Sequence, residues 1–214
     1  MKRSRTLAIL ASLAAVHGSL AACRPTPSER VAEGASAPWF EEIGARAGVD
    51  FVHHSGHGKQ HYLPEIMGGG AALFDMDNDG LLDVYFVQSG QLTDPSAGPG
   101  NRLYRNRGDG TFEDITERSG AGIKAYGMGV AAGDFDNDGY TDLYVTSLGH
   151  NVLLKNDGHG HFTDVSAKAG VASSGWSTSA AFLDYDGDGA LDLFVVHYLN
   201  WQRSADLECF SLGG

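Results

Sequence analysis

The sequence predicts an all-β protein, and three observations lead to that prediction. A pattern of residues returns about every 50 positions along the 214-residue chain. Within each period, short runs rich in Val, Leu, Tyr and Phe alternate with turn residues, which is typical of strands rather than helices. The chain also has 30 glycines and only 20% charged residues. That composition favours a folded, turn-rich domain over a charge-rich disordered chain.

Two sequence units alternate to build the repeat. The first unit reads AALFDMDNDGLLDVYFV from Ala71, VAAGDFDNDGYTDLYVT from Val130 and SAAFLDYDGDGALDLFVV from Ser179. The second unit reads NRLYRNRGDGTFEDITERSGAG from Asn101 and NVLLKNDGHGHFTDVSAKAGVA from Asn151. A partial copy of the second unit, FEEIGARAGV, begins at Phe40.

Each complete repeat contains four short runs that predict four strands. In the second repeat these runs are 130–132, 143–146, 152–155 and 162–165. Glycines at 108 and 110, and again at 158 and 160, predict tight turns that close the second hairpin of a repeat. Four strands in about 50 residues is the size of one β-propeller blade. We therefore expect residues 39–214 to form about three blades of an incomplete propeller.

An aspartate-rich loop recurs between the first and second predicted strands of each repeat, at 75–83, 134–142 and 184–192. Positions 1, 3, 5 and 9 are aspartates: Asp75, Asp77, Asp79 and Asp83; Asp134, Asp136, Asp138 and Asp142; Asp184, Asp186, Asp188 and Asp192. Position 6 is glycine, and the backbone carbonyl of position 7 (Leu81, Tyr140, Ala190) can complete an oxygen cage. Hard oxygen ligands in this number suit Ca²⁺, so we expect about three calcium ions, one in each loop.

Electrostatic repulsion favours an ion in these loops. Two carboxylates about 4 Å apart repel by roughly 4 kcal/mol at an effective dielectric constant of 20, so four in one loop need a cation or protons. The helix-flanked EF-hand loop begins with the same pattern but carries glutamate at position 12. Here that position is Phe86, Val145 or Val195, and the flanking runs predict strands. Solvated Asp-Gly turns without an ion remain the alternative.

These loops resemble the calcium sites of FG-GAP repeats, also called VCBS repeats, which form propeller blades in integrin α chains. The longer phrases LPEIMGGGAALFDMDNDG and LYRNRGDGTFEDIT resemble the cartilage acidic protein family, whose bacterial members often end in an ASPIC/UnbV domain. The resemblance runs from Trp39 onward. It implies calcium ligands at the twelve aspartates and no known catalytic residue. A propeller usually needs more blades to close, so the resemblance also implies a fragment of a longer protein.

The N-terminus predicts export. Residues 1–22 combine a basic start with an apolar run too short to span a bilayer, as a signal peptide does. The segment Leu20-Ala21-Ala22-Cys23 resembles a bacterial lipobox, which implies that Cys23 becomes lipidated and anchors the chain to the cell envelope. Ordinary cleavage with secretion is the alternative. Residues 23–38 predict a flexible tether. Cys209 is either a free thiol or half of a disulfide whose partner lies in the missing part.

Charge and motifs together favour a scaffold over an enzyme. The formal net charge of −12 makes nucleic acid an unsuitable partner. We expect an exported, calcium-stabilised scaffold for binding or adhesion, with a protein or carbohydrate ligand and membrane contact only through the anchor. The alternative is an enzyme, or its accessory domain, that uses the segment 53–61 with His53, His54, His57 and His61. A polar inserted loop explains the same histidines without any site.

Overall fold

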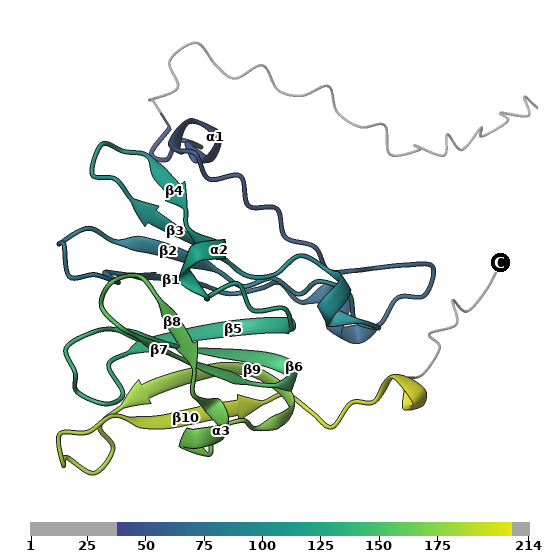
Figure 1. The fold of residues 1–214 in the computed structure, drawn as a ribbon. Coiled ribbons are helices and arrows are strands. Elements are labelled where there is room, and N and C mark those ends of the chain that lie inside the picture. The colour runs from purple at the N-terminus through teal and green to yellow at the C-terminus, as the bar shows by residue number, and fades with distance from the viewer. Residues whose placement is uncertain (1–37, 207–214) are drawn as a thin grey trace, which may run out of the picture. The chain divides into compact units, whose positions relative to one another are not determined.

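A computed structural model of the chain describes residues 38–206, and it confirms the all-β prediction (Figure 1). Every helix and strand of the described residues lies within 42–206, in the second of the two units into which the chain divides. Repeat 1 consists of β1 (Ala71–Phe74), β2 (Asp83–Phe86), β3 (Arg102–Asn106) and β4 (Phe112–Asp114). Repeat 2 consists of β5 (Tyr126–Gly133), β6 (Asp142–His150), β7 (Val152–Asn156) and β8 (Phe162–Asp164). Repeat 3 contributes β9 (Ser174–Leu183) and β10 (Asp192–His197).

Neighbouring strands within a repeat pair antiparallel in chain order. Repeat 1 forms a four-stranded sheet in the order β1-β2-β3-β4, and repeat 2 pairs its strands in the same way. The long strand β6 extends past its partner β7 and also pairs with β9 through Leu148↔Trp176 and His150↔Ser174. This pairing joins repeats 2 and 3 into one six-stranded sheet. The described residues form sheets of the propeller type without closing a ring.

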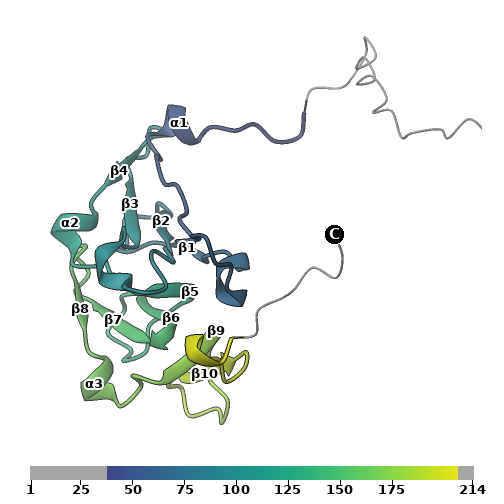
Figure 2. The same ribbon diagram turned by 90° about the vertical axis from the view of Figure 1, so that its right-hand side faces the viewer.

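The first strands of the three repeats lie close together. Figure 2 shows β1, β5 and β9 on one side of the sheets, with β4 and β8 on the other. Glycine permits this close approach, because a Cβ atom added to Gly129 of β5 would lie 2.6 Å from the backbone oxygen of Thr178 in β9. A Cβ atom on Gly70 would lie 3.0 Å from the Cα atom of Gly129. Backbones therefore meet here without side chains between them.

The main hydrophobic core lies between repeats 1 and 2. Each strand turns alternate side chains to opposite faces of its sheet, so one face of repeat 1 packs on the facing side of repeat 2. The buried members are Phe74, Met76, Tyr85, Val87, Leu103, Ile115, Ala121, Leu143, Val145, Leu154 and Phe162. A smaller cluster gathers Tyr126, Met128 and Trp176 with the partly buried Met67, Leu92, Leu148 and Trp201. Tyr85 and Tyr144, which occupy the same repeat position, are buried, whereas Phe194 at that position in repeat 3 is exposed.

The predicted turns are present, and short helical turns join them. Gly108, Gly110, Gly158 and Gly160 all have positive φ in the β3–β4 and β7–β8 connections. The short helices α2 (Thr116–Ser119) and α3 (Ser166–Ala169), which follow β4 and β8, were not predicted from the sequence. The remaining short elements are α1 (Gly44–Ala47), η1 (Leu63–Ile66), η2 (Pro95–Ala97) and η3 (Arg203–Ala205).

Several predicted features lie outside residues 38–206. The signal peptide (1–22), Cys23, nearly all of the tether (23–38) and Cys209 lie outside the described residues, so they stay predictions. Within 38–206, no helix has the length and apolar character needed to cross a membrane.

Candidate metal centres

The three aspartate loops occupy equivalent places in the fold. Each connects the first and second strands of its repeat, and all three emerge at the same end of the sheets (Figure 1). The strand register closes every loop in the same way, because the position 9 aspartate pairs with the residue just before position 1. The pairs are Phe74↔Asp83, Gly133↔Asp142 and Leu183↔Asp192. Strands flank the loops, so the EF-hand alternative is excluded.

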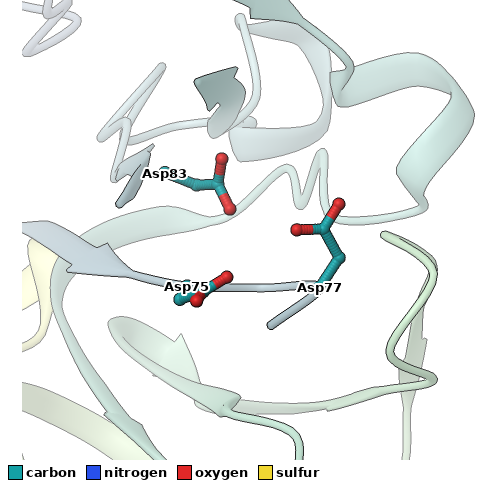
Figure 3. A group of neighbouring side chains, drawn as sticks. All are labelled: Asp75, Asp77 and Asp83. Carbon is teal, nitrogen blue, oxygen red and sulfur yellow. The ribbon is translucent and has the colours of Figure 1, made fainter. Parts of the chain in front are cut away.

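Three aspartates of each loop converge, namely those at positions 1, 3 and 9. In each group, one carboxylate oxygen from every residue lies within 4.8 Å of the others. The groups are Asp75, Asp77 and Asp83; Asp134, Asp136 and Asp142; and Asp184, Asp186 and Asp192. Figure 3 shows the carboxylates of the first group facing one another. The sequence therefore identified residues that the fold brings together.

Backbone amides hold the position 1 aspartate in place. Asp75 accepts hydrogen bonds from the N–H of Asp79 (3.1 Å) and of Gly80 (2.8 Å), and Asp134 repeats the arrangement. Gly80 has a φ of 85°, which lets the chain turn sharply around the carboxylate. The loop thus folds around its first side chain through local contacts.

The position 5 aspartates lie outside the converging groups. Asp79, Asp138 and Asp188 each accept a hydrogen bond from the N–H of the position 7 residue, at 2.8 to 3.0 Å. Each side chain therefore closes a small turn within its own loop. Coordination by position 5, and by the position 7 carbonyls of Leu81, Tyr140 and Ala190, remains a prediction.

The position 9 aspartates of repeats 1 and 2 are buried among backbone donors. Asp83 accepts from the N–H of Met76 (3.0 Å) and of Asn106 (2.8 Å). Asp142 accepts in the same way from Phe135 and Asn156. Burial raises the pKa of both carboxyls, that of Asp142 to about 6, although the N–H groups oppose the shift. A bound cation would favour the ionised forms of both groups.

Two basic side chains that were not predicted as part of the site reach these loops. Arg105 in β3 pairs with Asp77 (2.5 Å) and Asp79 (3.2 Å). Lys155 in β7 pairs with Asp136, and with Asp138 at 2.7 Å. The two residues are equivalent in the repeated phrases LYRN and LLKN, which was the available signal.

Asparagine side chains connect one loop to the next. At position 4, the Nδ2 of Asn78 donates to the carbonyl of Gly139 in the second loop (2.9 Å). Asn137 donates likewise to Gly189 in the third loop (3.1 Å). Both asparagines have φ values near 57°, a left-handed conformation that asparagine tolerates well. The loops therefore form a hydrogen-bonded series across the repeats.

The donor chemistry of these groups fits calcium. All the converging atoms are carboxylate oxygens, the hard ligands that Ca²⁺ prefers. Among the described residues, the buried Oδ1 atom of Asp77 has no hydrogen-bond partner, although Oδ2 of the same side chain pairs with Arg105. A buried anionic oxygen without a partner costs free energy, and a metal ion would satisfy it.

The histidines of segment 53–61 do not form a comparable centre. His53 accepts a hydrogen bond from the N–H of Gly69 at 3.2 Å and lies 3.0 Å from the hydroxyl of Ser89, while burial lowers its pKa. His53, His54 and His57 line a cavity of about 270 Å³. In the described part of the chain, each group of three side chains close enough to share an ion consists of aspartates. The described histidines of segment 53–61 therefore belong to no such group, and the alternative of an enzyme site in this segment stays a prediction.

Comparison with known proteins identifies the class. A profile of the FG-GAP-like repeat matches residues 75–145 and 134–195, more than half of the chain. The chain therefore belongs to the FG-GAP-like repeat family.

A curated relative supports this assignment. Cartilage acidic protein 1 of Xenopus tropicalis is 36% identical over 77 residues, which is 36% of this chain. The matched part spans 11% of that relative.

Proposed function

We propose that this chain is an exported, calcium-binding repeat protein that serves as a scaffold for binding or adhesion, with calcium in a structural role. The observation that carries the proposal is the same three-carboxylate group at equivalent points of three successive repeats. A solvated turn would not require three acidic side chains to converge on one point. A divalent cation offsets their mutual repulsion and couples the shape of each loop to the fold around it.

The proposed ligands come from every loop. Positions 1, 3 and 9 form the core of each site, and the position 5 carboxylate and position 7 carbonyl complete it after a local rearrangement. In this proposal the repeats present a surface to a protein or carbohydrate ligand and carry out no chemistry of their own.

Calcium titration of the full chain tests the proposal. After metal depletion, calorimetric titration should detect about three sites, and calcium should raise the melting temperature. At a free concentration 100 times the Kd, each site adds about 2.7 kcal/mol of stability. Magnesium should give a smaller gain, because it requires a tighter octahedral site. A melting curve that does not respond to calcium or to a chelator would contradict the proposal.

Single substitutions assign the sites. Asp75→Asn, Asp134→Asn and Asp184→Asn should each remove one ion from the measured stoichiometry. Asp109→Asn is the matched control, because Asp109 lies in an exposed turn outside the loops and bonds Thr111. Full stoichiometry in all three loop variants would refute the assignment.

Localisation forms a separate part of the proposal. We propose a lipid anchor at Cys23, which predicts that the exported protein partitions into the detergent phase of a cell extract. Cys23→Ala should move it to the aqueous phase. Recovery of the unsubstituted protein in the aqueous phase would instead indicate ordinary secretion.

A further inference from the structure

The third strand of each complete repeat places a basic side chain on the loop of that repeat. Arg105 and Lys155 stand one residue before Asn106 and Asn156, whose N–H groups bond the position 9 aspartates. This register fixes each basic side chain over positions 3 and 5. Lys155 Nζ contacts Oδ2 of both Asp136 and Asp138, and Arg105 Nη2 contacts Oδ2 of both Asp77 and Asp79.

We propose that Arg105 and Lys155 are tethered cations that compete with calcium for the first and second loops and thereby set the affinity of those two sites. This inference rests on the proposed calcium-binding function. It assigns to two residues of the chain a role that the carboxylates alone do not explain: they weaken metal binding and lessen the need for metal.

Electrostatics gives the sign of the effect. A calcium ion bound to Asp136 would lie beside the ammonium group that contacts the same carboxylate. A charge of +1 about 5 Å from a charge of +2 in water costs on the order of a tenfold loss in affinity. Without metal, the same ammonium group offsets repulsion between positions 3 and 5. The tethered cation therefore stabilises the metal-free loop more than the metal-bound loop.

The rest of the pocket does not depend on the tethered cation. In the second loop, backbone N–H groups hold Asp134 and Asp142, at positions 1 and 9. The N–H of Tyr140 holds Asp138 at 3.0 Å. Removal of the Lys155 charge should consequently leave the ligand framework in place, so that the lost repulsion dominates over any lost organisation.

The first and third loops differ from the second in their contacts with basic side chains. In the first loop, Arg105 lies 3.2 Å from Asp79, whereas Lys155 lies 2.7 Å from Asp138 in the second loop. The guanidinium group also spreads its charge over three nitrogens, so the effect of Arg105 should be smaller. In repeat 3, as far as the described residues extend, no basic side chain of the repeat forms an ion pair with Asp184 to Asp192. The third loop serves as an internal reference.

The test is a chelator-competition titration of the full chain, begun from the calcium-saturated, folded state. Lys155→Gln should tighten one of the three binding steps by about tenfold, and Arg105→Gln should tighten a different step by about threefold. The double variant should show both changes and leave the third step unaltered. Lys155→Arg keeps the charge and should restore the original affinity.

Two controls separate competition from a general change in charge. Arg102→Gln alters the same strand as Arg105, but Arg102 pairs with Asp114 rather than with the loop. Lys168→Gln removes a charge from α3, beyond the loop of its repeat. Neither should change any binding step by more than about twofold.

The outcomes distinguish this inference from the proposed function. If the unsubstituted chain binds no calcium, the proposed function fails and the inference fails with it. If the chain binds calcium but Lys155→Gln leaves all three steps unchanged or weakens one, the inference alone is overturned. Circular dichroism with a chelator adds a second readout, because both Gln variants should melt at a lower temperature without calcium and show a larger rise on adding it. An unchanged rise would also overturn the inference.

Discussion

Repeats 1 and 3 carry the same pattern of residues in different surroundings. Tyr85 of repeat 1 is 0% exposed, whereas the equivalent Phe194 of repeat 3 is 64% exposed. Met76 and Tyr185, both at position 2 of their loops, are 1% and 84% exposed. The face of repeat 1 is buried because repeat 2 packs against it, whereas nothing in the described residues covers the same face of repeat 3. A blade of this type gains most of its apolar burial from its neighbour.

The polar side chains of repeat 1 are also more buried, or make more contacts, than their counterparts in repeat 3. The position 9 aspartate is buried in repeat 1 and exposed in repeat 3. Position 4 is Asn78 in the first loop and Gly187 in the third, so only the first can donate a side-chain hydrogen bond to the next loop. Repeat 3 should therefore depend less on individual side chains than repeats 1 and 2 do.

The largest predicted difference in unfolding free energy between repeats 1 and 3 concerns the residue just before the first aspartate of the loop. Phe74 lies in the core at 4% exposure and its counterpart Leu183 is 41% exposed. Phe74→Ala should cost about 3 to 5 kcal/mol of unfolding free energy, because it opens a cavity between repeats. Leu183→Ala should cost less than about 1.5 kcal/mol. Urea denaturation in saturating calcium measures both, and similar losses would show that the two faces are equally buried.

Substitution of the position 9 aspartate should give the next largest difference in stability, here between repeats 2 and 3. Asp142→Ala leaves the N–H groups of Phe135 and Asn156 without their acceptor and should cost about 2 to 3 kcal/mol. The exposed Asp192 accepts from the N–H of Tyr185, which water can reach, so Asp192→Ala should cost about 1 kcal/mol or less. Both are measured by urea denaturation with a chelator present, so that lost metal binding does not contribute. A larger loss for Asp192→Ala would reverse the comparison.

A glycine exchange tests the close approach of the first strands. Gly129 and Ser179 occupy the same repeat position, but only a side chain at Gly129 would collide with the neighbouring backbone. Gly129→Ser should cost about 1 to 3 kcal/mol through overpacking. Ser179→Gly, at an exposed position, should change stability by about 1 kcal/mol at most. Thermal unfolding provides the readout, and a neutral Gly129→Ser would mean that the strands can separate there.

The series of asparagines should have the smallest effect. Asn137→Gly keeps the left-handed backbone but removes the hydrogen bond to Gly189, at a cost of about 0.5 to 1.5 kcal/mol. Gly187→Asn places an asparagine at position 4 of the third loop. No following loop is present among the described residues to accept a hydrogen bond from its side chain, so the substitution should not raise stability by a comparable amount. Chemical denaturation of both variants in calcium tests this, and a marked gain for Gly187→Asn would contradict it.

Much of the fold and of the candidate site could be predicted because the determining contacts are local. Alternating apolar residues bounded by glycine predict short strands, and the turns at Gly108 and Gly158 follow from the positive φ that glycine allows. The loop around Asp75 is likewise held by amides four and five residues away. Contacts of this kind recur wherever the local sequence recurs.

Only the tertiary structure decided which residues at equivalent repeat positions differ in burial and in ion pairing. It buried Tyr85 and exposed Phe194, joined β6 to β9, and brought Arg105 and Lys155 onto the aspartates of their loops. It also separated the position 5 aspartates from the converging groups. The sequence by itself determined the repeat, its strands and the acidic loops, since these depend on neighbours along the chain. Burial and ion pairing depend on which strand or repeat lies alongside, and that is a property of the folded chain.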